Sequence, residues 1–299
     1  MEINGVINVC KEAGYTSHDV VAKLRGILRQ KKIGHTGTLD PDATGVLPVC
    51  LGKGTRLCDM LTDHDKVYET VLHLGITTDT QDMSGKVLEE REVLVSPEQI
   101  RTCIAGFEGE QQQIPPMYSA LKVNGKKLYE LAREGKVVER KARSVHFFSI
   151  DVLQIQLPLV TMRVHCSKGT YIRTLCHDIG EKLGCGGCME KLVRTRVERF
   201  AIENAYKLDE IREYVSRGEV DQLVTPVDAM FNDCPAVYTG EEADRLVHNG
   251  NLFSVSNLRT VPVTDAERFR VYDSREQFIG IFQKKGDTFS PVKMFWSGQ

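Results

Sequence analysis

The stretch that most constrains this chain runs from Gly34 to Gly52 and reads GHTGTLDPDATGVLPVCLG. Its four glycines and two prolines suit tight turns and close backbone approach rather than a helix or a strand, so we expect a shaped loop. Pro41 restricts the backbone of Asp40 to extended or turn conformations, and Leu39 can be buried beside it. Such a loop can hold one carboxylate at a fixed angle, so Asp40 is the candidate for chemistry. From these residues alone, a simple turn is the stronger alternative.

The remaining sequence is typical of a folded protein with a sizeable core, since 41% of its 299 residues are hydrophobic and 27% are charged. This length fits one large domain and one small domain. The chain has no apolar window of about 18 residues and no basic-then-apolar start, so we expect no membrane segment and a cytoplasmic location. Its nine cysteines follow no framework spacing and are expected to be free thiols.

Positive charge is concentrated locally although the net charge is only -2. The segment from Lys122 to Arg143 carries eight basic residues against three acidic ones. It is a candidate phosphate-binding surface, although a run of charge is more often only a solvated face. A second group of basic residues precedes the glycine-rich stretch and forms a positive rim beside it, namely Arg25, Arg29, Lys31 and Lys32.

Periodicity and capping signals predict helices and strands around these features. A helix is expected to start at Thr16 or Ser17, and a capping box at Ser96 opens another. Strands are expected over residues 66–75, 160–166 and 192–200, and the first of them carries Tyr68. A tyrosine in a strand usually packs in the core, but it can also stack on an extruded base.

Three other motifs resemble sites of different chemistry. Cys185 and Cys188 form one C-x-x-C pair, and the adjacent Cys176-His177 is poorly placed to complete a zinc site, so we expect no metal there. The turn 79–85 lacks the oxygen spacing of a calcium loop. The run 52–55 lacks the glycine that a phosphate-binding loop needs five residues earlier, where Leu47 stands.

The run GHTGTLDPDATGVLP resembles the GHTGxLDPxATGxLP signature of the TruB family of pseudouridine synthases, and the resemblance implies that Asp40 is the catalytic residue. Lys66-Val67-Tyr68 matches the family's K-x-Y motif, which implies that Tyr68 packs against the target base. SKGTYIRTL matches a second motif, which implies that Arg173 pairs with Asp40 and that Tyr171 lies near the base.

Further matches extend this resemblance over nearly the full chain. LVRTRVERF implies that Leu192 packs against the base, and His35 is implied to enter the space that the base vacates. The run PPMYSALKVNGKKLYELAREG resembles a family insertion that closes over the RNA stem-loop, with Lys126 and Lys127 contacting phosphates. One departure is Glu12, where the family usually has proline in a K-P-x-G turn.

The resemblance implies an α+β fold, with a mixed, largely antiparallel central sheet flanked by helices and a small C-terminal β-rich domain of the PUA type. The expected catalytic domain covers residues 1–234, with the RNA-clamping insertion at about 108–145, and the PUA-like domain covers 235–299. The expected activity is isomerisation of uridine 55 in the tRNA T-loop by a monomer, with Asp40 as nucleophile and without cofactor or metal. Whether Asp40 attacks C6 of the base or C1′ of the ribose stays open, and an RNA chaperone is the alternative function.

Overall fold

The computed structural model describes residues 2–123, 125–261, 264, 266–296 and 298. Within this part of the chain one large sheet consists of β1 (Gly5–Lys11), β2 (Ile33–His35), β3 (Thr44–Leu51), β4 (Lys66–Leu74), β7 (Gly109–Gln113), β10 (Arg143–Gln156), β11 (Leu159–Cys166), β12 (Gly187–Val197), β13 (Phe200–Ala201) and β14 (Val224–Thr225).

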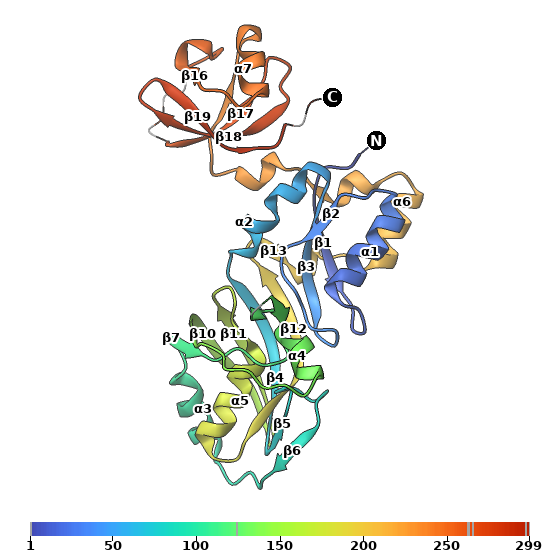
Figure 1. Ribbon diagram of the computed structural model, residues 1–299, viewed down its shortest axis with the longest axis vertical. Helices are drawn as coiled ribbons and strands as arrows, with labels where there is room; N and C mark the ends of the chain where they lie inside the picture. Colours follow the sequence, from blue (N-terminus) through green and yellow to red (C-terminus); the bar gives the residue numbers. More distant parts are fainter. Residues whose placement is uncertain (1, 124, 262–263, 265, 297, 299) are drawn as a thin grey trace.

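The strand order of this sheet is β14-β1-β3-β12-β4-β11-β10-β7, with β2 paired to β3 and β13 to β12. Strands β12 and β3 are parallel, and the other pairs are antiparallel. Helices lie against the sheet along its length (Figure 1). The expected mixed, largely antiparallel sheet flanked by helices is therefore confirmed.

The helices are α1 (Ser17–Leu28), α2 (Cys58–Thr62), α3 (Pro97–Ala105), α4 (Leu128–Arg133), α5 (Ile172–Leu183), α6 (Leu208–Ser216) and α7 (Asp244–His248). Helix α1 begins as its sequence predicts, because the Thr16 side chain accepts a hydrogen bond from the Asp19 amide and Asp19 caps Thr16 in return. The apolar face of α1 is buried with α6 against the inner residues of β1 and β3, including Ile7, Val9 and Leu47. This half of the sheet supports the glycine-rich stretch.

The other half of the sheet has a separate core formed with α3 and α5. Phe147, Met162 and Val164 of strands β10 and β11 pack against Ile104 of α3 and Leu175 of α5. A hairpin of β5 (Ile76–Thr78) and β6 (Val87–Glu90) extends from β4, and a short hairpin of β8 (Lys122–Val123) and β9 (Lys126–Lys127) precedes α4. The sheet thus carries two helix-covered cores whose boundary lies near β12 and β4.

The glycine-rich stretch differs from the expected loop. Residues 34–35 belong to β2 and Thr44–Leu51 forms β3, so only residues 36–43 are irregular. The expectation of no strand here was wrong because the apolar run after Gly45 is buried and pairs with β1 along its whole length. Gly45 is required within this strand, since its φ is +105° and a Cβ there would lie 2.2 Å from the Arg194 carbonyl oxygen.

A second sheet follows Cys234, in the order β15 (Ala236–Tyr238), β17 (Arg268–Tyr272), β18 (Phe278–Lys285), β19 (Thr288–Met294) and β16 (Phe253–Ser254). Ile281 and Phe295 from this region pack with Phe231, so the two sheets share a small apolar contact. Figure 1 shows the second sheet as a small barrel-like unit beyond η4 (Asp228–Phe231). Among the described residues, no helix has the length and apolar character needed to cross a membrane.

Candidate active site

The irregular segment 36–43 is held in place by contacts with two neighbouring elements, β1 and α1. The buried Lys11 ammonium on β1 donates to the carbonyl oxygens of Pro41 at 2.9 Å and Ala43 at 2.6 Å. At the start of α1, the Ser17 hydroxyl accepts a hydrogen bond of 2.9 Å from the Leu39 amide. These contacts restrain the backbone on both sides of Asp40, so its carboxylate has a defined direction.

Asp40 faces Arg173, which is in the first turn of α5. The Nε of Arg173 lies 3.0 Å from Oδ2 of Asp40, and its Nη2 donates to Oδ1 at 3.2 Å. This is the fork-to-fork geometry in which guanidinium binds carboxylate most strongly. The Arg173 side chain is only 6% exposed, whereas that of Asp40 is 38% exposed. The arginine therefore belongs to the wall of the site, and the carboxylate can meet a substrate.

Burial and charge act on Asp40 in opposite directions. Burial raises the pKa of Asp40 above its ordinary value, and the Arg173 guanidinium opposes that rise. Without this guanidinium the carboxyl would be protonated at a higher pH. The pairing therefore helps Asp40 to remain ionised.

Arg173 is itself held by a second carboxylate and two carbonyls. Its Nη1 lies 3.4 Å from Oδ2 of Asp82 and donates to the Thr80 carbonyl at 3.1 Å, and its Nη2 donates to the Tyr118 carbonyl at 2.9 Å. Asp82 is fixed in turn by hydrogen bonds to its Oδ1 from the Ser84 amide and from the hydroxyls of Thr80 and Ser84. The guanidinium is therefore locked in one orientation by three separate segments of the chain.

Apolar and aromatic side chains line the same site. Tyr68 on β4 is buried in one cluster with Leu39, Ala43 and Leu192. The pKa of Tyr68 is raised by burial and drawn down by the neighbouring Arg194. The structure thus places Tyr68 and Leu192 beside the segment that carries Asp40.

Arg194 is a buried cation beneath the same segment. It is 1% exposed, and its Nε donates to the Val46 carbonyl at 2.7 Å. A Cβ placed on Gly37 would lie 3.7 Å from its Nη1. The guanidinium therefore lies next to the irregular segment at Gly37.

Tyr171 is positioned by a side-chain amide. It is the N-cap residue of α5, and its side chain makes no capping bond. The buried Gln113 supplies the contacts instead, since its Oε1 accepts from the Tyr171 amide at 2.9 Å and its Nε2 donates to the Tyr171 carbonyl at 3.0 Å. This amide clamp sets the start of α5, and with it the placement of Tyr171 and Arg173.

His35 and the two lysines lie at the margins of the site. The His35 ring meets the His18 ring edge-on at 5.1 Å, and burial lowers the pKa of His35, so it is neutral at pH 7. Lys126 pairs with Glu134 at 3.4 Å, and Lys127 donates to the Tyr129 hydroxyl at 3.2 Å. These lysines belong to β9, whereas His35 belongs to β2, directly before the irregular segment 36–43.

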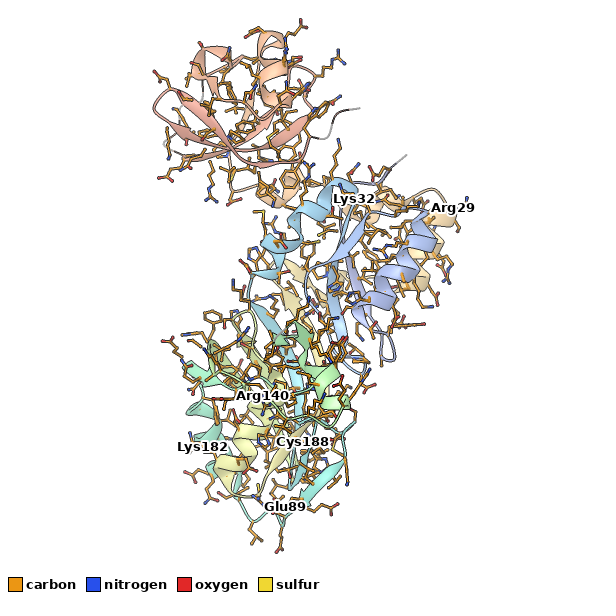
Figure 2. The ribbon with its side chains drawn as sticks, viewed as in Figure 1. Arg29, Lys32, Glu89, Arg140, Lys182 and Cys188 are labelled. Atoms are coloured by element: carbon orange, nitrogen blue, oxygen red, sulfur yellow. The ribbon has the colours of Figure 1, made fainter. Side chains whose placement is uncertain are left out.

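Other positively charged residues are spread over the same body. Figure 2 places Arg29 and Lys32 toward its end nearest the second sheet and Arg140 in its lower half. Arg29 and Lys32 belong to the expected positive rim, whereas Arg140 belongs to the separate basic segment 122–143. Cys188 donates to the Met83 sulfur at 3.3 Å, and the described residues contain no metal-binding group of three or more His, Cys, Asp or Glu side chains.

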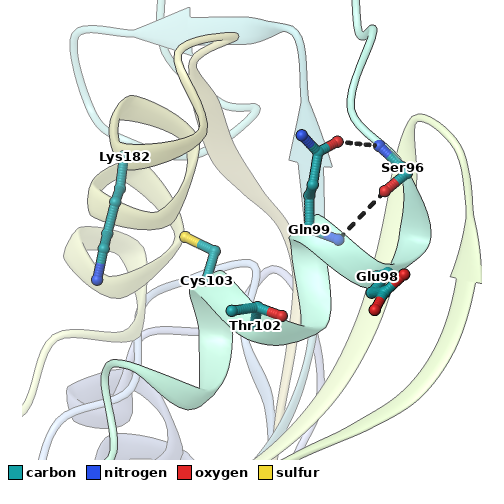
Figure 3. Close-up of a pocket in the computed structure, with 6 residues that line it drawn as sticks. All are labelled: Ser96, Glu98, Gln99, Thr102, Cys103 and Lys182. Atoms are coloured by element: carbon teal, nitrogen blue, oxygen red, sulfur yellow. Dashed lines mark hydrogen bonds between the residues drawn. The ribbon is translucent and has the colours of Figure 1, made fainter.

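Sequence reasoning brought Asp40, Tyr68, Arg173, Tyr171 and Leu192 to one site, and the structure places these residues around one irregular segment. It missed Lys11, Asp82, Gln113 and Arg194, whose contacts join distant parts of the chain. The only sequence signal for Asp82 is its place in a polar turn. A recess of about 440 Å³ lies elsewhere, between α3 and α5 (Figure 3). It is lined by Ser96, Glu98, Gln99, Thr102, Cys103 and Lys182.

Comparison with known families gives matches to most of the chain. Residues 25–172 match the N-terminal domain of the TruB family pseudouridylate synthases, and residues 173–232 match the C-terminal domain of tRNA pseudouridylate synthase B. The tRNA pseudouridine synthase B of Lachnoclostridium phytofermentans is 54% identical over 307 residues, covering 98% of this chain and 100% of the relative. That of Clostridium kluyveri is 43% identical over 293 residues, with the same coverage of both chains.

Solved structures share the fold. A chain of a Cbf5-Nop10-Gar1 complex superposes with a TM-score of 0.71 at 29% identity, covering 97% of this chain and 84% of that chain. A chain of an H/ACA RNP bound to a substrate RNA containing 2′-deoxyuridine gives a TM-score of 0.70 at 27% identity, with the same coverage. The similarity extends through both sheets.

Proposed function

The chain belongs to the TruB family of pseudouridylate synthases, and from that premise we propose that it converts uridine 55 of the tRNA T-loop to pseudouridine, with Asp40 as the nucleophile. The observation that carries this proposal is the forked contact of Arg173 with Asp40, at 3.0 and 3.2 Å. A carboxylate that is paired with a guanidinium, restrained and accessible suits attack on an electrophilic carbon of the base or the ribose.

The reaction breaks the N1–C1′ bond, turns the uracil and joins C5 to C1′. No atom is added and no electron is exchanged with another molecule, so the balance of the reaction requires no cofactor. The detached base must be retained while it turns. Tyr68 and Leu192, buried beside Asp40, supply an aromatic and an aliphatic wall for that purpose. Tyr68 stacks on the uracil and takes part in removing the C5 proton.

The uridine leaves its stack to reach Asp40, at a cost of a few kcal/mol. Stacking on an aromatic side chain stabilises the flipped base by about 1–3 kcal/mol, and phosphate contacts offset the rest of the unstacking cost. His35 is neutral and lies on β2 beside the irregular segment, so its ring can fill the space that the base vacates. Lys126 and Lys127 on β9 contact phosphates of the T stem-loop.

The proposed organisation follows the same reasoning. Residues 1–234 form the catalytic domain, in which the segment of about 108–145 closes over the RNA, and residues 235–299 form a PUA-like RNA-binding domain. The protein works as a monomer in the cytoplasm, where its tRNA substrate is found. A binding role without turnover, as an RNA chaperone, is the competing function.

The test uses an unmodified tRNA transcript and a T stem-loop oligonucleotide, each incubated with the full chain. Carbodiimide mapping should then find one new pseudouridine, at position 55, in both RNAs. Uridine labelled with tritium at C5 should release its label in proportion. Tight binding of tRNA without release would refute the enzymatic proposal and favour the chaperone. Modification at another uridine would refute the assignment of position 55.

A further inference from the structure

Arg194 carries a positive charge that is buried without a matching negative charge. Its Nε donates to the Val46 carbonyl, but its Nη2 has no hydrogen-bond partner among the described residues. None of the ion pairs in that part of the chain includes it. A charged group that is 1% exposed is ordinarily paired, because desolvating it is costly. Nη2 is therefore available to hydrogen-bond a group that becomes negative only during the reaction.

The strand register identifies that group. Arg194 on β12 is directly opposite Tyr68 on β4, and both side chains are buried. Residues paired in this way have Cβ atoms about 4.5–5.5 Å apart on one face of the sheet. A guanidinium on so long a side chain can reach the phenol oxygen. Gly37 leaves space above it, and Gly45 allows the strands to approach.

Resting on the isomerase function proposed above, we propose that Arg194 is a positioning residue that acts through Tyr68. Its guanidinium holds the Tyr68 hydroxyl toward the uracil and stabilises the phenol oxygen while that oxygen carries negative charge. This gives a role to the free nitrogen, and it explains why an arginine rather than an apolar residue fills this part of the core.

The proton balance of the isomerisation gives Tyr68 two linked tasks. When the N1–C1′ bond breaks, its electron pair stays on the base, and the Tyr68 hydroxyl proton passes to N1. The oxygen is then a phenolate beside Arg194. C5 then bonds to C1′, the bond between Asp40 and the substrate breaks to return the free carboxylate, and the proton on C5 passes to the phenolate and restores the hydroxyl. One proton leaves C5 and one arrives at N1, so neither an oxidant nor a second base is consumed.

Tyr68 is faced by three groups that affect its charge. Arg194 lies on β12, Cys166 on β11 and Asp40 on the irregular segment. Burial raises the pKa of Tyr68, Arg194 opposes the rise, and Asp40 and Cys166 add to it. Arg194 is therefore the neighbour among these three that stabilises the phenolate.

Three other basic groups surround the guanidinium. Burial, aided by the charge of Arg194, lowers the pKa of Lys11 and of Lys66 to about 8 each. The charge of Arg194 also lowers the pKa of His35. The Lys11 and Lys66 ammonium groups are engaged with backbone carbonyls, so neither replaces Arg194 at the phenol.

The experiment compares Arg194→Met with the wild-type chain in steady-state pseudouridine formation over a range of tRNA concentrations. We expect kcat to fall by about 10²-fold, the low end of the usual contribution of a proton-transfer group, with KM for tRNA unchanged. Arg196→Met is the matched control, because Arg196 is two residues along the same strand and its side chain is 46% exposed. It should retain the wild-type kcat.

A role through Tyr68 is distinguished from a structural role by changing the acidity of the phenol. Tyr68→3,5-difluorotyrosine has a more acidic hydroxyl and should restore most of the lost rate in Arg194→Met, while changing the wild-type rate little. Fluorine NMR of this residue gives its titration midpoint without requiring turnover, and the midpoint should be higher in Arg194→Met than in wild type. This readout remains valid if the proposed RNA substrate is wrong.

The proposal would be overturned if the titration midpoints were equal in wild type and Arg194→Met. It would also be overturned if the fluorinated residue did not restore the lost rate. Arg194 would then have a structural role only. If Arg194→Met does not fold, Arg194→Lys takes its place, since an ammonium keeps the charge without the planar fork. The rate loss, its restoration by the fluorinated residue and the higher titration midpoint should then all appear, but each should be smaller. Their absence would count equally against the proposal. Absence of wild-type turnover would refute the isomerase function, whereas the midpoints alone test the role of Arg194.

Discussion

Replacing Arg173 by methionine should move the acid limb of the pH–rate profile to higher pH. Asp40 must be ionised to act, and Arg173 is the strongest influence that lowers its pKa against the effect of burial. Loss of a neighbouring opposite charge raises a carboxyl pKa by about 1–3 units, so we expect the limb to rise by that amount. Below the pKa, the ionised fraction and the rate fall tenfold per pH unit.

The same substitution should also reduce stability. It leaves the Thr80 and Tyr118 carbonyls without their donor, at a cost of about 1–3 kcal/mol for each acceptor that stays buried and unpaired. Rates must therefore be measured well below the melting temperature of the variant. Arg173→Lys keeps the charge and should shift the limb less, although it loses the fork.

The assay is release of tritium from C5 under single-turnover conditions at saturating enzyme, over a range of buffers from acid to neutral pH. Arg163→Met is the control. Arg163 on β11 is half-exposed and pairs with Glu69 on the neighbouring strand β4. Its profile should match that of the wild type. An acid limb that stays in place in Arg173→Met would refute the argument that the guanidinium maintains Asp40 as a carboxylate.

Three further changes test the supporting contacts. Gln113→Leu removes both bonds to the Tyr171 backbone and should lower the free energy of unfolding by about 1–3 kcal/mol in a denaturant titration, with a smaller kcat. Gly45→Ala should lower the melting temperature far more than Gly135→Ala, because both have positive φ but only the first meets the facing strand. Lys127→Glu should weaken tRNA binding and reduce the slope of affinity against salt by about one. Unchanged values in these measurements would contradict the corresponding contacts.

Local signals in the sequence predicted much of the fold. The helix start at Thr16, the strand that carries Tyr68 and the capping box at Ser96 with proline at the first helical position were all found as expected, because each depends on residues close together in the chain. The stretch after Gly45 was mispredicted. Its glycines and prolines resemble loop chemistry, but the surrounding strands bury it and fix it as β3.

Site residues could be predicted from the sequence only where they lie in a recognised motif. Asp40 and Arg173 lie 133 positions apart, and the family resemblance brought them together where periodicity could not. Asp82 and Gln113 have no such local signature, because an aspartate in a turn and a glutamine at a strand end are ordinary. Their contacts with α5 exist only after the sheet has formed, so they required the structure.

The most direct test of the central claim is the single-turnover rate of Asp40→Asn on a tRNA transcript. Asparagine keeps the size and the polar character of the side chain but cannot carry the negative charge that the site is built to hold. The variant should fold and bind tRNA as the wild type does, while releasing no C5 tritium and forming no pseudouridine at position 55. Release at the wild-type rate would show that Asp40 is not the nucleophile.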